Sequence, residues 1–425
     1  MKKIIALISI LMVACFAVSV YAVDTKDDMV LYESGSFMAS HTRNAPVYLN
    51  YVGTTGVSAA PLGTGIAFQP LVGDVNGDGI DDIVVTWGDV ADSNRMNWTA
   101  GHSTIDWYTG VGMFSTAATS TMAFGPPLGT PGGVDVVKAR FLADINGDSA
   151  DDAIYVTTAY GWKGAYSSGG LSKTAYGTVP TTGTYQFGTT GDIPLVGNFD
   201  GDKNTGNTWG DANIMDICVY RPSTGQWYVA KSGPGGFFGS GGIVIGTFGL
   251  PADTPLVGDI NGDGRDDAII VSDVDADGDL DWRAAYADAT GMIDPTGYTW
   301  SGGGFGLVGD VPFVADINGD GKADIGVIRK SSVSWLKYQS VGFTTGTGQL
   351  YAGGAGDRVN VQYGLYSDTT LIGQVGAPPA DGANFYSIVG DYSGDGKVNF
   401  TDLQTFVDNW LVNCVAYPTD AACLY

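Results

Sequence analysis

Four stretches of the sequence carry oxygen-bearing side chains at a spacing that suits a calcium ion. Each reads Asp-x-Asn-x-Asp-x-x-x-Asp, so that side chains at positions 1, 3, 5 and 9 and the carbonyl at position 7 can converge on one point. Calcium takes roughly six to eight oxygen ligands, and glycine at position 6 permits the sharp turn. The predicted ligands are Asp74, Asn76, Asp78, Ile80 and Asp82 (loop 1); Asp144, Asn146, Asp148, Ala150 and Asp152 (loop 2); Asp259, Asn261, Asp263, Arg265 and Asp267 (loop 4); and Asp316, Asn318, Asp320, Lys322 and Asp324 (loop 5).

Two of the loops depart from this pattern. Loop 2 has Ser149 at position 6, where loops 1, 4 and 5 have glycine, and we expect it to bind calcium more weakly. A further copy, loop 3, is interrupted by a polar insertion at residues 203–213. Its predicted ligands are Asn198, Asp200, Asp202 and Asp216.

Two further acidic stretches lie outside this series. The ligand spacing of one of them predicts either a calcium site or an acidic, solvated turn in the second hairpin of a repeat; its residues are Asp273, Asp275, Asp277, Asp279 and Asp281. The other places oxygens at positions 1, 3, 5, 7, 9 and 12 of an EF-hand loop and runs into an amphipathic helix at 403–411. Its predicted ligands are Asp391, Ser393, Asp395, Lys397, Asn399 and Asp402.

The composition agrees with a role for these aspartates in metal binding. The 425 residues carry a net charge of −25, and Glu33 is the only glutamate among 45 acidic residues. Asp is favoured where a short carboxylate must fold back into its own loop. Only 20 Lys and Arg are present, which argues against a nucleic-acid partner, since phosphate binding needs a basic surface.

The N-terminus predicts export. Two lysines precede an apolar run at 4–20 and a small-x-small cleavage site that ends at Ala22, so residues 1–22 read as a signal peptide. A loose lipobox gives the alternative of a lipid-anchored Cys15. No later stretch is long and apolar enough to span a membrane. We therefore expect a secreted or cell-surface protein, with a disulfide between Cys414 and Cys423 and a buried thiol at Cys218.

The repeat of the loops indicates the fold. They start at 74, 144, 198, 259 and 316, a period that suits a four-stranded blade of an all-β propeller. An apolar run leads into each loop and a strand rich in Ile and Val leaves it. One tryptophan per repeat is expected on the third strand, where packing between blades is a simpler role than ligand binding; these are Trp98, Trp162, Trp227, Trp282 and Trp335.

A sixth repeat is split between the two ends of the chain. Residues 364–373 parallel 249–258, but Gln374 replaces the first loop aspartate. Residues 29–51 offer three strands that could complete this blade and close the ring. We expect six four-stranded blades. Seven is the alternative, if 91–120 or 340–364 contains another.

These motifs resemble the FG-GAP or VCBS repeats of integrin α-chains and bacterial surface proteins over residues 29–375. Phe187-Gly188, Phe248-Gly249 and Phe305-Gly306 supply the Phe-Gly element before three loops. The resemblance implies a propeller with a calcium hairpin between the first two strands of each blade. The C-terminal EF-hand loop resembles half of a dockerin. A dockerin has two such loops, so a small calcium-folded tag is the alternative to a cohesin-binding module.

The predicted organisation is a signal peptide (1–22), a propeller (23–375), a linker (376–386) and the dockerin-like tail with its small helical segment (387–425). About five to seven Ca²⁺ ions are expected to stabilise it.

The function expected from this organisation is a non-catalytic binding or adhesion module for an extracellular protein or a glycan. Tyr160 and Trp162, and the pair Trp107 and Tyr108, could stack on sugar rings. A polysaccharide lyase or hydrolase, or an accessory subunit of one, is an alternative, although the only histidines are His41 and His102 and no nucleophile motif occurs. A structural subunit of a surface layer or filament is another.

Overall fold

The computed structural model of the chain describes most of the repeat region. The residues described are 28–33, 36–42, 49–53, 57–58, 62, 66–105, 112–113, 119–128, 137–167, 170–171, 185–204, 212–233, 241–294, 298–300, 304–316, 321–329, 334–338, 349–350, 358–362 and 369–373. The predicted signal peptide, linker, dockerin-like tail and Cys414–Cys423 disulfide all lie outside these residues.

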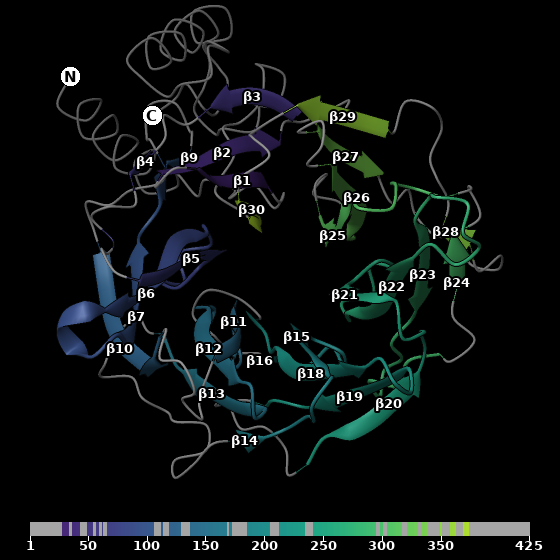
Figure 1. Ribbon diagram of the computed structural model, residues 1–425, viewed down its shortest axis with the longest axis horizontal. Helices are drawn as coiled ribbons and strands as arrows, with labels where there is room; N and C mark the ends of the chain where they lie inside the picture. The colour runs from purple at the N-terminus through teal and green to yellow at the C-terminus, as the bar shows by residue number, and fades with distance from the viewer. Residues whose placement is uncertain are drawn as a thin grey trace, which may run out of the picture.

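The described residues form an all-β structure, built mainly from six antiparallel sheets (Figure 1). We number five of them 1–5, after the loops they carry, and call the sixth the terminal sheet. In chain order, sheet 1 consists of β5 (Ile66–Gly73), β6 (Asp82–Asp89), β7 (Arg95–Gly101) and β10 (Thr119–Pro127); sheet 2 of β11 (Val137–Ala143), β12 (Asp152–Thr157), β13 (Gly161–Ala165) and β14 (Tyr185–Gln186); and sheet 3 of β15 (Ile193–Gly197), β18 (Asp216–Arg221), β19 (Gln226–Ala230) and β20 (Ile243–Thr247).

Two more sheets repeat this order and the terminal sheet joins the two ends of the chain. Sheet 4 consists of β21 (Thr254–Gly258), β22 (Asp267–Ser272), β23 (Asp281–Ala285) and β24 (Tyr298–Trp300), with β28 (Gln349–Leu350) parallel to β24; sheet 5 consists of β25 (Val311–Ala315), β26 (Asp324–Arg329), β27 (Ser334–Tyr338) and β29 (Arg358–Gln362). The terminal sheet has the order β3 (Leu49–Gly53), β2 (Ser36–Thr42), β1 (Asp28–Glu33) and β30 (Thr369–Gly373), and β4 (Val57–Ser58) also pairs with β2.

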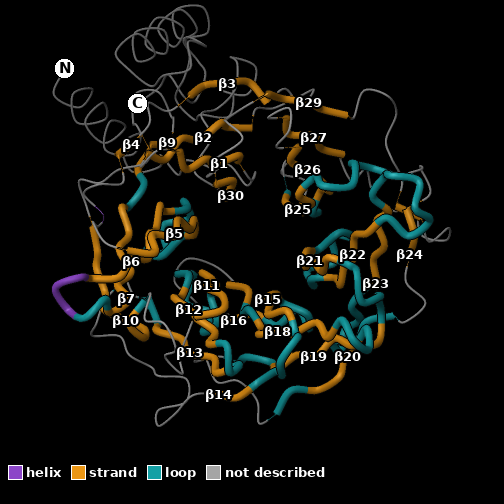
Figure 2. The backbone as a smooth tube through the Cα atoms, viewed as in Figure 1, coloured by secondary structure: helices purple, strands orange, loops and turns teal. Residues whose placement is uncertain are grey.

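Two short hairpins complete the described strands. They are β8 (Thr104–Ile105) with β9 (Gly112–Met113), and β16 (Lys203–Asn204) with β17 (Ala212–Asn213). A single 3-10 turn, η2 (Val90–Asp92), is the helical element of the described part, coloured purple in Figure 2. No helix in the described residues is long and apolar enough to cross a membrane.

The sheets are arranged around a common centre, as in a propeller, with the first strand of sheets 1–5 and β30 of the terminal sheet innermost (Figure 1). The inner strands of successive sheets touch: β5 contacts β11, β11 contacts β15, β15 contacts β21, and β21 contacts β25. Strand β30, from the C-terminal end of the repeat region, contacts β5 in the same way. It also pairs antiparallel with β1, with Asp28 opposite Gly373. The predicted sharing of one sheet by both ends of the chain is thus confirmed.

The second strand of each of sheets 1–5 is buried almost throughout, because its side chains lie in the cores between neighbouring sheets. β12 shows this in every residue, and β18, β22 and β26 in all but the last. Their sequences are accordingly rich in Ile, Val and other apolar residues between the first aspartate and the last residue, without the polar alternation of a strand that has one face in water. Cys218, predicted as a buried thiol, lies fully buried in β18.

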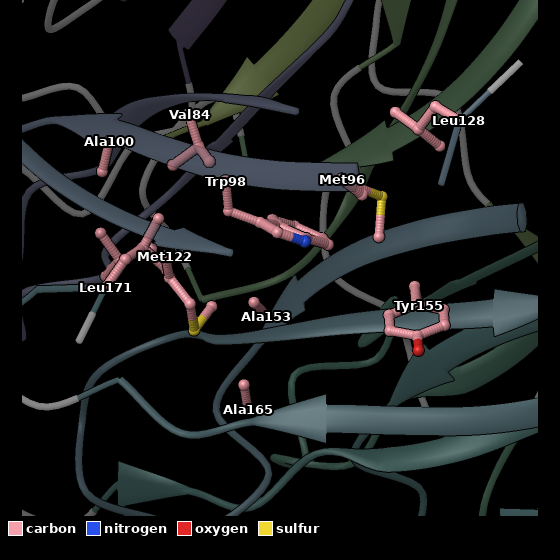
Figure 3. Close-up of a cluster of buried hydrophobic side chains, with 11 residues drawn as sticks. Val84, Met96, Trp98, Ala100, Met122, Leu128, Ala153, Tyr155, Ala165 and Leu171 are labelled. Carbon is pink, nitrogen blue, oxygen red and sulfur yellow. The ribbon is translucent and has the colours of Figure 1, made fainter. Parts of the chain in front are cut away.

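The core fills the spaces between sheets. Figure 3 shows one such cluster, in which Val84, Met96 and Trp98 of sheet 1 pack with Ala153 and Tyr155 of sheet 2. Equivalent clusters join sheets 2 and 3, 3 and 4, and 4 and 5. The tryptophans of the first four repeats are completely buried in them, which confirms their predicted packing role; these are Trp98, Trp162, Trp227 and Trp282.

Each of these tryptophans also holds a Phe-Gly turn. The indole N–H of Trp162 donates to the Phe187 carbonyl, that of Trp227 to Phe248, and that of Trp282 to Phe305, each at 2.8 Å. Trp98 makes the equivalent bond to Phe124, at 2.9 Å. Phe124-Gly125 is therefore a fourth Phe-Gly element that the sequence analysis did not identify.

Candidate metal centres

The acidic loops connect the first and second strands of sheets 1–5, as predicted. All five close in the same register, because the residue before position 1 pairs with the aspartate at position 9. The pairs are Gly73 with Asp82, Ala143 with Asp152, Gly197 with Asp216, Gly258 with Asp267 and Ala315 with Asp324. This register places the aspartate at position 9 beside the residue that precedes position 1.

Left-handed backbone conformations produce the tight turns. At position 6, Gly79, Gly264 and Gly321 have φ between 80° and 82°. Ser149 of loop 2 adopts φ 74° at the same position, a conformation that costs a residue with a Cβ about 1–2 kcal/mol. Loop 2 therefore keeps the shape of the others at the cost of local strain.

The carboxylate at position 1 organises loops 1, 2 and 4. Asp74 Oδ1 accepts hydrogen bonds from the Gly77 and Asp78 N–H groups (2.7 and 3.2 Å), and Oδ2 accepts one from Gly79 N–H (2.7 Å). Asp144 and Asp259 accept the corresponding N–H groups of loops 2 and 4. In each case Oδ2 accepts only one of these hydrogen bonds, so the bonds orient the carboxylate and leave a lone pair on Oδ2 able to bind a cation.

The aspartate at position 9 is the buried member of each set. Asp82, Asp152, Asp216 and Asp267 are 0% exposed. In each, Oδ1 accepts a backbone N–H from just beyond the third strand; the donors are Ser103, Ser167, Ser232 and Ala287, at 2.7–2.9 Å. The second oxygens differ: Oδ2 of Asp216 and Oδ2 of Asp267 are buried and have no hydrogen-bond partner among the described residues.

Burial makes these carboxylates resist ionisation. It raises the pKa of Asp267 to about 8, and the negative charges of Asp259 and Asp263 raise it further while the Ala287 N–H lowers it. Burial likewise raises the pKa of Asp216 to about 8 and those of Asp74 and Asp144 to about 6. A cation among these oxygens would offset both the desolvation and the mutual repulsion of the carboxylates.

Loop 1 differs from the others because a histidine enters it. His102 Nδ1 lies 3.0 Å from Asp82 Oδ2 and 3.3 Å from Asn76 Nδ2. The hydrogen bond to Asp82 raises the pKa of His102, and burial opposes that rise. His102 precedes Ser103, as Tyr166, Lys231 and Tyr286 precede the equivalent donors in sheets 2, 3 and 4.

Loop 3 contains a cationic neighbour. Lys231 Nζ lies 3.1 Å from Asp200 Oδ2 and donates to the Thr290 carbonyl (2.7 Å). Asp202 Oδ1 is buried and has no partner among the described residues, and burial raises the pKa of Asp202 to about 7. The ends of the insertion form the β16–β17 hairpin, and Asn204 of this hairpin donates to the Gly147 carbonyl of loop 2 (2.8 Å).

The acidic stretch 273–281 lies in the second hairpin of sheet 4, as predicted. It joins β22 to β23, and carboxylate oxygens of Asp273, Asp275 and Asp281 all lie within 4.8 Å of one another. Asp273 accepts N–H groups from Asp277 and Gly278, the pattern seen at Asp74. This cluster is more exposed than loops 1–4.

Some predicted site residues lie outside the described part of the chain. They are Asn318 and Asp320 of loop 5, the EF-hand residues 391–402, and the sugar-stacking pair Trp107 and Tyr108. For Tyr160 and Trp162, packing in the core is the correct interpretation and sugar stacking is not. Tyr160 is 3% exposed with its hydroxyl donating to the Asp192 carbonyl, and Trp162 is completely buried, so both belong to the core.

Comparison with known proteins gives distant structural likenesses. No family model and no curated protein matches the chain. Among solved structures, an Agrocybe aegerita lectin that recognises non-reducing terminal N-acetylglucosamine is 16% identical, with a TM-score of 0.45 over 83% of this chain and 96% of the lectin. A TcdB2–TccC3 structure without its hypervariable C-terminal region is 12% identical, with a TM-score of 0.36 over 74% of this chain and 14% of that one. Likenesses this distant carry no weight for ligand or mechanism.

Proposed function

We propose that this chain is a calcium-binding β-propeller in which the acidic loops hold Ca²⁺ as structural ions. The observation that carries this proposal is Asp267: it is completely buried, one of its oxygens has no partner among the described residues, and Asp259 and Asp263 of the same loop raise its pKa. An isolated buried carboxylate is costly, and such groups are normally paired with a cation or bound to a metal.

The chemistry of the donors favours calcium over other metals. Loops 2–5 offer carboxylate, amide and carbonyl oxygens, which suit calcium and other hard cations, and they lack the thiolate and imidazole groups that favour zinc or copper. Asp259, Asn261, Asp263 and Asp267, with the Arg265 carbonyl, would hold the ion of loop 4. The N–H groups that bond to Asp259 keep its carboxylate turned into the loop.

The architecture we infer is a closed propeller of six blades and of FG-GAP or VCBS type. It is supported by the β1–β30 pairing, by the contact of β30 with β5, and by the Trp-to-Phe-Gly hydrogen bonds of sheets 1–4. In this arrangement the terminal sheet is the sixth blade and carries no calcium loop.

The role that follows is that of a scaffold stabilised by calcium outside the cell. With about 2 mM calcium and a dissociation constant of about 0.1 mM, each site would add roughly 1.8 kcal/mol to the free energy of unfolding. Several such sites rival the net stability of a domain. We infer a secreted or cell-surface binding module whose protein or glycan ligand meets other surfaces of the blades. A glycan array combined with a reducing-sugar assay would separate binding from catalysis.

The decisive experiment compares Asp267→Asn with wild type. Thermal melts in 2 mM calcium and in excess EDTA should show a large calcium-dependent rise in Tm for wild type and a smaller one for the variant. Asp92→Asn is the matched control, because Asp92 is exposed in η2 and the substitution removes the same charge. Calorimetry should count one ion fewer for Asp267→Asn. A wild-type melt that is unchanged by EDTA would overturn the proposal.

A further inference from the structure

Adjacent loops are bonded to each other around the ring. The residue at position 8 of one loop donates its N–H to the carbonyl at position 1 of the preceding loop. The four bonds are Asp151 to Asp74 (2.6 Å), Met215 to Asp144 (2.8 Å), Asp266 to Asn198 (2.7 Å) and Ala323 to Asp259 (2.7 Å). Position 8 immediately precedes the buried aspartate at position 9. Each bond therefore joins the first predicted ligand of one loop to the residue next to the last predicted ligand of the following loop.

Two of these four connections are double. The Asp151 carboxylate accepts the N–H of Asp74 through Oδ2 (3.1 Å), and Asp266 accepts the N–H of Asn198 in the same way (2.7 Å). The backbone N–H and C=O of Asp74 are thus both bonded to Asp151 of loop 2. Those of Asn198 are both bonded to Asp266 of loop 4. Where position 8 is Met215 or Ala323, only the backbone bond is present.

The chain has glycine where this close approach requires it. A Cβ on Gly73 would lie 2.5 Å from Asp151 Oδ2, and one on Gly197 would lie 3.0 Å from Asp266 Oδ2. Such distances are shorter than ordinary contacts between a side chain and its neighbour. The carboxylates of Asp151 and Asp266 therefore fit directly against the backbone of the preceding loop.

We propose that calcium binding is positively coupled between loops 1 and 2 and between loops 3 and 4, through Asp151 and Asp266. This rests on the proposed function of the loops as calcium sites. An ion in loop 1 fixes the Asp74 peptide, and that peptide in turn holds Asp151 and the adjacent ligand Asp152. The conformational cost of ordering the shared peptide is met by whichever ion binds first, so the second ion binds more tightly.

Electrostatics acts in the same direction. Asp151 lies close enough to Asp74 and Asp144 to feel both charges, so it borders the ligand sets of two loops. A carboxylate between two divalent ions reduces their mutual repulsion. The coupling is reciprocal, as linkage requires, so loss of either site should weaken the other.

A double-mutant cycle tests this coupling on the full chain. Asp144→Asn removes a loop 2 ligand, and Asp151→Ala removes the side-chain connection without changing any predicted ligand. Calcium titrations followed by calorimetry and native mass spectrometry should show that Asp144→Asn weakens loop 1 by about 5-fold or more in wild type. In the Asp151→Ala background the same substitution should leave loop 1 unchanged.

A second pair of variants separates loss of coupling from misfolding, because one variant should lower the coupling and the other should raise it. Asp266→Ala reproduces the residue found naturally at Ala323, and it should reduce the cooperativity between loops 3 and 4. Ala323→Asp places a carboxylate beside the backbone of Asp259, where loops 4 and 5 have only the backbone bond. Asp259 follows Gly258 as Asp74 follows Gly73, so a carboxylate can approach there, and the coupling of loops 4 and 5 should increase. Equal titration curves for wild type and all variants, with calcium still bound, would overturn the coupling alone. Absence of bound calcium in wild type would instead overturn the proposed function.

Discussion

His102 Nδ1 lies 3.0 Å from Asp82 Oδ2, so an imidazole approaches the oxygen whose counterparts in Asp216 and Asp267 have no partner among the described residues. The side chain of His102 is 14% exposed and that of Asp82 is 0% exposed. Among the described residues of the acidic loops, Asp82 is thus the position 9 aspartate that contacts a histidine.

The first prediction is that the calcium affinity of loop 1 depends on the charge of His102. Because Asp82 raises the pKa of His102 above 6.5, the imidazolium persists toward neutral pH and opposes a cation. Affinity at loop 1 should therefore rise as the pH increases through this raised pKa. Calorimetry at pH 6 and 8.5 should show the change in wild type and a smaller one in His102→Gln. Tyr166→Phe, at the equivalent position of sheet 2, should leave loop 1 unaffected.

A second prediction concerns stability without calcium. Burial raises the pKa of Asp216 and Asp267 from 3.8 to about 8, so the folded protein binds their protons more tightly than the unfolded chain does. Their contribution is fully present below about pH 4 and is lost as the pH rises to about 8. The Tm of calcium-depleted protein should fall between pH 5 and 9, whereas in excess calcium it should not. A rise in both conditions would contradict the assigned burial.

Loop 2 provides a third prediction, since Ser149 has φ 74° where loops 1, 4 and 5 have glycine. Ser149→Gly should relieve about 1–2 kcal/mol of strain, against about 0.5–1 kcal/mol for the greater freedom of glycine in the unfolded chain. The net stabilisation should be about 0.5 kcal/mol, measured by denaturant unfolding in calcium. The reciprocal change, Gly79→Ser, should destabilise loop 1; stabilisation by both substitutions would refute the explanation.

The fourth prediction tests the tryptophan bonds to the Phe-Gly turns. Trp227→Phe should remove the hydrogen bond to the Phe248 carbonyl and part of the packing, lowering the free energy of unfolding by roughly 1–3 kcal/mol. Trp87→Phe is the control, because Trp87 is only half-buried and its N–H bonds to the Thr99 hydroxyl. Equal losses for the two variants would show that the turn carbonyl contributes nothing.

Much of this fold was predictable because its signals are local. The loops, the flanking strands and the split terminal sheet follow from residue types at a fixed spacing, and the structure confirms the pairing of β1 with β30. Phe124-Gly125 was missed because it stands farther ahead of loop 2 than the other Phe-Gly pairs stand ahead of their loops, with residues 129–136 in between.

The connections between loops were not predictable in the same way. They join backbone groups of residues distant in sequence, such as Asp74 and Asp151, and backbone groups have no residue-type signature. The sequence contains Gly73 before loop 1 and Asp151 at position 8 of loop 2, but it does not indicate that the two residues are in contact. Only the structure shows that the Asp151 carboxylate lies against Gly73. His102 was noted only as one of two histidines, since nothing in its neighbours marks its approach to Asp82.

The pairing of β1 with β30 also fixes an order of events during synthesis. Strand β1 lies near the beginning of the chain and β30 follows all five acidic loops, so the terminal sheet must wait until almost every other strand has been made. A contact between such distant segments is slow to form, because a very long loop must close first. Until β30 is made, the edge of β1 that faces it has no partner strand, so this edge of the terminal sheet is exposed to other chains for most of synthesis.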